Sequence, residues 1–245
     1  MNRSDFLKGM LLTGIGLHIS PITLFANNQT SYSISQLTGQ GGLDLTGSPQ
    51  QLQKEVWNAY EEMRTAAKSE GINIQVVSGY RTYARQKAIY EAKYGRFTRE
   101  GMTPEKAITE ILKYSTLPGT SRHHWGTDMD IIDANQPQPA SVLEEEHYLG
   151  DGVYSKMKAW LDLHSEAFGF YEVYNNNESR KGFQYEPWHF SYKAIAVPML
   201  EEFMCMDLDA IIAQDNLSGK HILKGSFLNR YYTENILDIN PELIP

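Results

Sequence analysis

Two short segments of this chain contain the side chains that most restrict what it can fold into. The first is Ser121–Asp130, with the sequence SRHHWGTDMD, and the second is Glu186–His189, with the sequence EPWH. Together they hold three of the seven histidines, two of the four tryptophans and three carboxylates. A hydrolytic zinc takes three protein ligands, for which His and Asp are suitable, and needs a further carboxylate as general base. If the segments form one such site, the fold has to bring them together.

The first segment leads into a predicted β-strand, residues 129–132. Asp128 and Asp130 share one face of that strand, because successive side chains alternate between the two faces. Gly126, just before it, permits a tight turn that can return a histidine towards the same face. The pattern therefore places a histidine and two acids on one side of a strand.

In the second segment, Glu186 and His189 are separated by an odd number of residues. A regular strand would point these two side chains to opposite faces. Pro187 cannot donate a hydrogen bond to a neighbouring strand, so we expect a local break there. Such a break would allow both side chains to face one metal.

Composition limits the partners and the kind of metal site. With 245 residues and 41% hydrophobic side chains, the chain is long and apolar enough for one domain with a sizeable core. Its net charge of -8 gives no electrostatic reason to bind nucleic acid or an anionic membrane. The single cysteine, Cys205, excludes an intrachain disulfide and a zinc site built on several cysteines. We expect a monomer without a stable membrane partner.

The N-terminus predicts export. Arg3 and Lys8 precede residues 9–26, an uncharged stretch rich in Leu, Ile and Gly that ends in a small residue. This pattern is typical of a secretory signal peptide, so we expect residues 1–26 to be removed. The protein would then act in the periplasm or cell envelope.

Two alternatives concern this leader. An uncleaved membrane anchor is the first, although Pro21 and several polar residues argue against it. The start of the chain also resembles a twin-arginine export signal, but Ser4 stands where the second arginine belongs. The export route therefore stays open.

Periodicity and turn residues predict an α+β domain over residues 49–245, after a polar linker over residues 27–48. Helices and short strands mix without a regular βαβ rhythm, which favours this class over α/β. The expected helices cover residues 49–70, 83–94, 104–114, 154–167 and 194–214, and a further short element is expected over residues 226–238. The expected strands cover residues 72–77, 129–132, 168–174 and 183–192.

Three motifs, at residues 78–86, 121–130 and 186–189, resemble those of the VanY-type D-alanyl-D-alanine carboxypeptidases, including their order along the chain. That family belongs to a wider group with the lysostaphin-type peptidases and the hedgehog domain. The first motif, S-x-H-x-x-G-x-x-x-D, is matched by Ser121, His123, Gly126 and Asp130, and the second, E-x-x-H, by Glu186 and His189. The third is Ser78-Gly79-Tyr80-Arg81, with Gln86 five residues on. The resemblance covers roughly residues 50–195.

The resemblance implies a fold and a role for each residue. It implies a small antiparallel sheet with flanking helices, on which one zinc ion is held by His123, Asp130 and His189. Glu186 would be the catalytic base. Arg81, Gln86 and Ser121 would contact the substrate, Arg81 and Gln86 at its carboxylate or at the developing oxyanion. Asp128 departs from the family, which often has a small apolar residue at that position.

Several roles stay open from the residues alone. His124 is an alternative metal ligand, and Arg81 is alternatively a structural ion-pair partner. Asp128 and Asp133 are candidates to orient a ligand from behind, although Asp133 also fits a solvated loop. Trp125 of the first segment and Trp188 of the second either pack around the site or stack on a substrate.

The expected reaction is zinc-assisted hydrolysis of the C-terminal peptide bond of peptidoglycan stem peptides, D-Ala-D-Ala in particular. Glu186 would take the proton of the attacking water and pass it to the leaving amine. Arg81 would hold the terminal carboxylate through its planar fork. An L,D-carboxypeptidase and a cross-link endopeptidase are alternatives with the same site. A zinc-stabilised cell-wall binding module is the alternative outside enzymes, because fold alone does not imply turnover.

Overall fold

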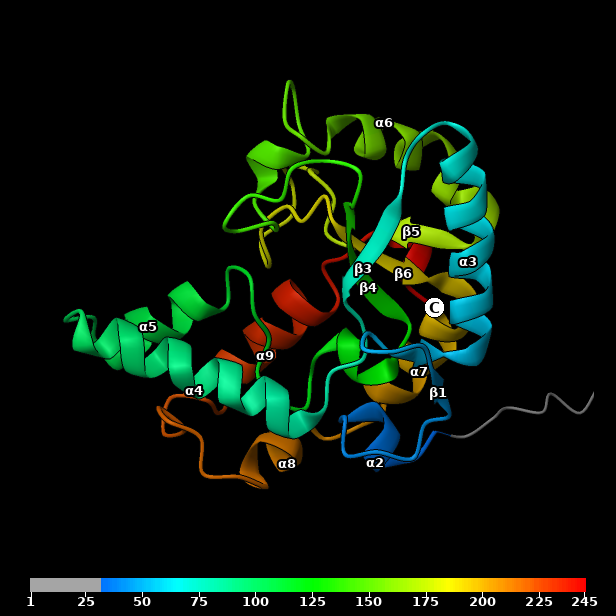
Figure 1. Ribbon diagram of the computed structural model, residues 1–245. Helices are drawn as coiled ribbons and strands as arrows, with labels where there is room; N and C mark the ends of the chain where they lie inside the picture. Colours follow the sequence, from blue (N-terminus) through cyan, green and yellow to red (C-terminus); the bar gives the residue numbers. More distant parts are fainter. Residues whose placement is uncertain (1–31) are drawn as a thin grey trace, which may run out of the picture. The chain divides into compact units, whose positions relative to one another are not determined.

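A four-stranded antiparallel sheet carries both segments (Figure 1). The computed structural model describes residues 32–245. The sheet has the strand order β3-β4-β6-β5, and β1 and β2 form a separate pair. The strands are β1 (Leu45–Thr46), β2 (Leu52–Gln53), β3 (Ile74–Ser78), β4 (Asp128–Asp133), β5 (Phe170–Glu172) and β6 (His189–Tyr192). A small antiparallel sheet among helices confirms the predicted α+β class.

Helices surround this sheet, and side-chain caps fix where some of them begin. Thr82 caps α4 by accepting a hydrogen bond from the Arg85 backbone, and Thr103 caps α5 with Pro104 at the first helical position. The α-helices are α2 (Ile34–Leu37), α3 (Lys54–Ser69), α4 (Tyr83–Arg99), α5 (Pro104–Ile111), α6 (Ser155–His164), α7 (Lys193–Met204), α8 (Leu208–Ala213) and α9 (Ser226–Tyr231). The short 3₁₀ and π turns are η1 (Arg122–Trp125), η2 (Glu145–His147), η3 (Ser165–Phe168), η4 (Tyr232–Ile236) and η5 (Pro241–Leu243).

One face of the sheet is closed by α3 and α6. Met129 and Ile131 of β4 belong to the same buried cluster as Met63 of α3 and Leu161 of α6. Burying a side chain of this size contributes roughly 1.5–3 kcal/mol, so the register of β4 is strongly specified. Because side chains alternate along a strand, Asp130 emerges on the opposite face.

Strand pairing aligns the motifs on that opposite face. Asp130 on β4 stands opposite His189, the first residue of β6, and opposite Ser78, the last residue of β3. Ser78 leads directly into the loop that contains Arg81. Residues from three distant parts of the chain therefore meet at one end of the sheet.

The C-terminal helices support the loop that leads into the first segment. Figure 1 shows α4, α5 and α9 gathered on one side of the molecule, away from α3. The Tyr231 hydroxyl of α9 accepts a hydrogen bond from the Leu117 backbone at 3.1 Å and lies 2.6 Å from the Thr120 hydroxyl. Helix α9 thus holds residues 117–120, the segment that leads into the first motif.

Three predicted elements differ from the structure. The helix expected over residues 49–70 begins only at Lys54, because residues 52–53 pair with β1 and the Gln53 backbone donates to Gly126. The strand expected over residues 183–192 is reduced to β6. The helix expected over residues 194–214 divides into α7 and α8, and a capping aspartate restarts it at α8.

Part of the predicted linker, residues 27–48, is folded. Ser33 and Gln36 form a capping box at α2, and Leu37 is buried. The Trp125 indole donates to the Leu37 carbonyl at 3.1 Å, which ties this segment to the domain. The predicted signal peptide lies outside the described residues. Within residues 32–245, no helix has the length and apolar character needed to cross a bilayer.

Candidate metal centre and peptide-binding cavity

Three buried side chains converge at the end of the sheet. His123 of η1, Asp130 of β4 and His189 of β6 each offer an atom within 4.8 Å of the others. Nε2 of His123 lies 3.4 Å from one Asp130 oxygen, and Nδ1 of His189 lies 3.6 Å from the other. Two imidazoles and one carboxylate around a common point form a suitable set of ligands for zinc.

Gly126 makes this convergence possible. It ends η1 with φ 65°, in the left-handed region that favours glycine. A Cβ there would also lie 2.9 Å from a Leu45 methyl group, so a larger residue would have to displace that side chain. The turn returns His123 to the face of Asp130, as the sequence predicts.

The second segment breaks at Pro187, also as predicted. Residues 187–188 form a turn, in which the His189 backbone donates to the Glu186 carbonyl at 3.1 Å. This turn brings both side chains to one side, and Oε2 of Glu186 lies 3.0 Å from Nδ1 of His189. A carboxylate beside the three ligand atoms is positioned to accept a proton there.

In both histidines, the ring nitrogen that faces away from the cluster contacts an oxygen acceptor that orients the ring. Nδ1 of His123 lies 2.9 Å from the Gly79 carbonyl, and Nε2 of His189 lies 3.0 Å from Oδ2 of Asp128. A carbonyl or carboxylate behind an imidazole holds the proton on the outer nitrogen. The inner nitrogens, Nε2 of His123 and Nδ1 of His189, are then the ones available to a metal.

Asp128 is fully buried and accepts four hydrogen bonds. Its Oδ2 also receives Nε of Arg122 at 2.8 Å, and its Oδ1 receives the hydroxyls of Thr127 and Ser191, each at 2.7 Å. Burial opposes ionisation, but the Arg122 guanidinium and the hydrogen bond with His189 hold the pKa of Asp128 far below its usual range. This carboxylate is therefore a fixed negative charge behind His189.

Charges within the cluster favour a cation. Burial raises the pKa of Asp130, but the adjacent His123 and His189 lower it further, to about 2. Burial lowers the pKa of His189, but its hydrogen bonds with Asp128 and Glu186 raise it to about 10. A histidine that holds its proton between carboxylates marks a position where a divalent cation can replace that proton.

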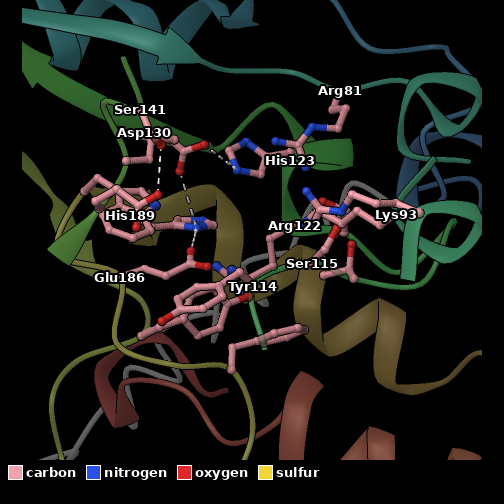
Figure 2. A pocket seen from close by; sticks show the side chains of 18 residues that line it. Arg81, Lys93, Tyr114, Ser115, Arg122, His123, Asp130, Ser141, Glu186 and His189 are labelled. Carbon is pink, nitrogen blue, oxygen red and sulfur yellow. Dashed lines mark hydrogen bonds and ion pairs between the residues drawn. The ribbon is translucent and has the colours of Figure 1, made fainter. Parts of the chain in front are cut away.

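A cavity of about 540 Å³ opens beside the cluster. Figure 2 shows Ser141 near Asp130 at one end of it, and Arg81 and Lys93 towards the other end. Nη1 of Arg81 donates to Oε1 of Gln86 at 2.8 Å, and Nη2 donates to the Ser78 hydroxyl at 2.9 Å. These two bonds fix the guanidinium and leave its other N–H groups for a ligand.

The comparisons with known proteins agree with this geometry. The family model described as VanY, D-alanyl-D-alanine carboxypeptidase, matches residues 49–195. The chain belongs to the VanY family. The resemblance inferred from the three motifs is thereby confirmed, and the predicted enzyme class agrees with the family's description.

Individual relatives support the same assignment. A D-alanyl-D-alanine carboxypeptidase of Enterococcus faecalis is 28% identical over 182 residues, which are 73% of this chain and 59% of that protein. The chain thus spans less than two thirds of that relative. Among solved structures, VanYB in complex with D-alanine-D-alanine has a TM-score of 0.52 at 23% identity and covers 72% of this chain and 92% of its own. A VanY D,D-pentapeptidase variant with Zn(II) has a TM-score of 0.50 at 23% identity, covering 71% and 91%. These two structures share the fold.

Within this VanY-family chain, His124 turns away from the cluster. Its Nδ1 lies 2.6 Å from the Arg81 carbonyl, and its Nε2 accepts a hydrogen bond from the Gly119 backbone at 3.2 Å. Burial lowers the pKa of His124 to about 3, so it is neutral. The alternative of His124 as a ligand is therefore wrong, and its side chain instead supports the Arg81 loop.

Gln86 requires a correction. The resemblance implied contact with the substrate, but the side chain is 0% exposed. Besides accepting from Arg81, it donates to the Ser115 hydroxyl and the Thr116 carbonyl. Gln86 thus lies behind Arg81 and positions it. Ser121 is 1% exposed and is among the residues that line the cavity, and its contact with a substrate stays a prediction.

The remaining open roles divide between packing and the cavity. Trp125 packs on Phe203, whereas Trp188 lines the cavity and packs on Tyr148. Asp133, at the far end of β4, accepts hydrogen bonds from backbone amides in the adjoining loops and does not orient a ligand.

Sequence reasoning missed many of the residues that line the cavity, among them Lys93, Arg122 and Tyr174. Arg122 stands within the first motif at a position where the motif specifies no residue. Tyr174 packs edge-on against His189, with ring centroids 5.0 Å apart. Neither residue belongs to a metal-ligand spacing, so only the three-dimensional arrangement identifies them.

Proposed function

We propose that this protein is a zinc-dependent carboxypeptidase that removes the C-terminal residue of peptidoglycan stem peptides, with D-Ala-D-Ala as the preferred terminus. The observation that carries the proposal is the meeting of three ligand side chains, a free carboxylate and an arginine fork in one cavity. The motif order, the family and the two VanY structures, one with D-alanine-D-alanine and one with Zn(II), support it.

The residues fit one zinc ion per chain. His123, Asp130 and His189 supply two imidazole nitrogens and a carboxylate oxygen, the set that leaves a fourth position open in catalytic sites. Oδ1 of Asp130 is buried and has no hydrogen-bond partner within residues 32–245. A buried, unsatisfied carboxylate oxygen is costly unless a cation accompanies it. When bound, zinc would polarise the scissile carbonyl and the attacking water.

The protein side chains would perform the remaining steps. Arg81 binds the terminal carboxylate through a charge-assisted fork, so the last peptide bond is directed to the cluster. Glu186 accepts a proton from the attacking water and passes it to the departing amine. Glu186 is buried, and the lower local dielectric strengthens its charged interactions.

Glu186 also distinguishes an enzyme from a zinc-stabilised binding module. A binding module needs the three ligands but no carboxylate beside them, and it needs no fixed arginine in an adjoining cavity. The leader sequence, with its charged start and apolar run, supports the proposal that this activity takes place in the periplasm or cell envelope.

Mass spectrometry of defined muropeptides tests this function. Purified protein with zinc should convert a stem pentapeptide into the tetrapeptide and free D-alanine, and a chelator should stop the reaction. A tetrapeptide ending in one D-alanine tests the L,D-carboxypeptidase alternative, and a cross-linked dimer tests the endopeptidase alternative. If the protein cleaves the tetrapeptide or the cross-linked dimer but not the pentapeptide, the proposed D-Ala-D-Ala specificity is wrong.

A further inference from the structure

Lys93 is a half-buried cation at the Arg81 end of the cavity. Its side chain lines the cavity but makes no hydrogen bond or ion pair with any residue between 32 and 245. Burial lowers the pKa of Lys93, while the nearby Glu186 carboxylate raises it. A desolvated amine normally has a paired acceptor, so this position is arranged for an anion that comes from outside the chain.

Helix α4 places a second cation beside it. Residues 86, 93 and 96 are spaced at seven and three along α4, which puts them on one face of the helix. Gln86 supports Arg81 from this face, and Lys93 and Arg96 continue along the cavity wall. Arg96 is exposed, and its ion pair with Glu100 spans 4.0 Å at the surface. Because such a surface pair is weak, Arg96 can also bind a ligand.

Two residues that line the cavity also have unsatisfied donors, although these atoms are enclosed by the protein. Nη1 of Arg122 and the Thr116 hydroxyl are buried, and neither has a hydrogen-bond partner in the part of the chain that the structure describes. Both residues line the cavity. Asp130, Glu144 and Glu186 also line the cavity, but within residues 32–245 none of them forms an ion pair with Lys93 or Arg96. These two cations therefore keep N–H groups that an acidic ligand can use.

The position of these groups indicates which part of a substrate they contact. In Figure 2, Arg81 and Lys93 lie beyond His123, on the side away from Asp130, His189 and Glu186. If Arg81 holds the carboxylate of the residue that is released, Lys93 lies on the leaving-group side. A released D-alanine has only one carboxylate, which Arg81 would bind. It has no second anionic group that could contact Lys93.

We propose that Lys93, assisted by Arg96, forms an anion subsite that binds a second carboxylate on the leaving group. The inference rests on the proposed function and deepens it. The protein would then accept acidic leaving groups larger than D-alanine and prefer them to neutral ones of equal size.

Three acetylated peptides of the form L-Lys-D-Ala-X test the subsite, with X as D-alanine, D-glutamine or D-glutamate. D-glutamine and D-glutamate have nearly the same shape and differ by one charge. In the wild type, kcat/KM for D-glutamate should exceed that for D-glutamine by about fivefold or more, as a partly exposed charge-assisted bond implies. In Lys93→Gln this ratio should fall to about one. Arg99→Gln is the matched control, because Arg99 is exposed on the same helix and does not line the cavity. There the ratio should persist.

Calorimetric binding of the same peptides to the zinc-loaded Glu186→Gln protein separates this inference from the proposed function. If the D-glutamate peptide binds more tightly through Lys93 but the wild type cleaves no peptide, the subsite stands and the function fails. If peptides are cleaved without preference for D-glutamate, or the preference survives Lys93→Gln, the subsite is wrong and the function stands.

Discussion

Nε2 of His189 lies 3.0 Å from Oδ2 of Asp128, on the side of the imidazole that faces away from the cluster. The Asp128 carboxylate is held in place by Arg122 and Ser191, so it fixes both the orientation and the tautomer of the ring. Asp128 thus orients a candidate metal ligand.

Asp128→Asn should weaken zinc binding without removing any ligand. An amide keeps the shape but loses the charge, and outer partners of this kind change metal affinity by about 10- to 100-fold. Competition with a chromophoric chelator measures the change. Asp133→Asn is the control, since that buried carboxylate lies on the same strand but bonds only backbone amides in the adjoining loops. Equal affinity in Asp128→Asn and wild type would show that Asp128 only packs.

The adjacent histidines should behave differently when each is replaced. His123→Ala removes one of three ligands and should lose most bound zinc. His124→Asn should retain zinc, because His124 faces the Arg81 carbonyl instead of the cluster. Elemental analysis of both purified variants measures this. Loss of zinc in His124→Asn with retention in His123→Ala would reverse the assignment.

Arg81 should determine the preference for a free C-terminus. Arg81→Ala should lower kcat/KM on a stem pentapeptide by about 10- to 100-fold, the range for a hydrogen bond to a charged group, while zinc stays bound. Arg81→Lys keeps the charge but loses the fork, so it should also be impaired. The wild type should cleave the free acid faster than the C-terminal amide, and rates should be compared on both. Equal rates would mean that no carboxylate anchor exists and would favour endopeptidase activity.

His124 should make the metal-free protein sensitive to mild acid. Its pKa is lowered to about 3 in the folded state from an ordinary value near 6.5, so the unfolded chain binds the additional proton. The stability that this neutral ring contributes is present above about pH 6.5 and is lost as the pH falls towards 3, by up to about 1.4 kcal/mol per pH unit. Urea unfolding between pH 7 and 4 should be less pH-dependent in His124→Asn than in wild type. The same pH dependence in both would contradict this account.

The parts of the site that are local in sequence could be predicted from the sequence. Gly126, the alternation of Asp128 and Asp130, and the break at Pro187 follow from backbone conformation and strand geometry. The register that sets Asp130 opposite His189 depends on long-range pairing, so only the family resemblance indicated that they meet.

Other features depended on tertiary context. The family resemblance assigned Gln86 to the substrate, and nothing in a helical pattern shows that Ser115 and Thr116 enclose it. No sequence pattern distinguishes Lys93 from a solvated lysine on the surface of a helix, so only the structure places it at the cavity. The helix predicted from residue 49 was shortened because strand pairing of residues 52–53 outweighed local helix signals.

The central claim is that the three ligands hold zinc while Glu186 performs the proton transfer. Zinc content and D-alanine release, measured on the same preparation of Glu186→Gln, test it most directly. The amide keeps the shape of the side chain but cannot accept a proton. We predict full zinc occupancy, with release of D-alanine from a stem pentapeptide reduced by at least ~10²- to 10⁴-fold. Wild-type activity in this variant, or loss of zinc together with activity, would contradict the account.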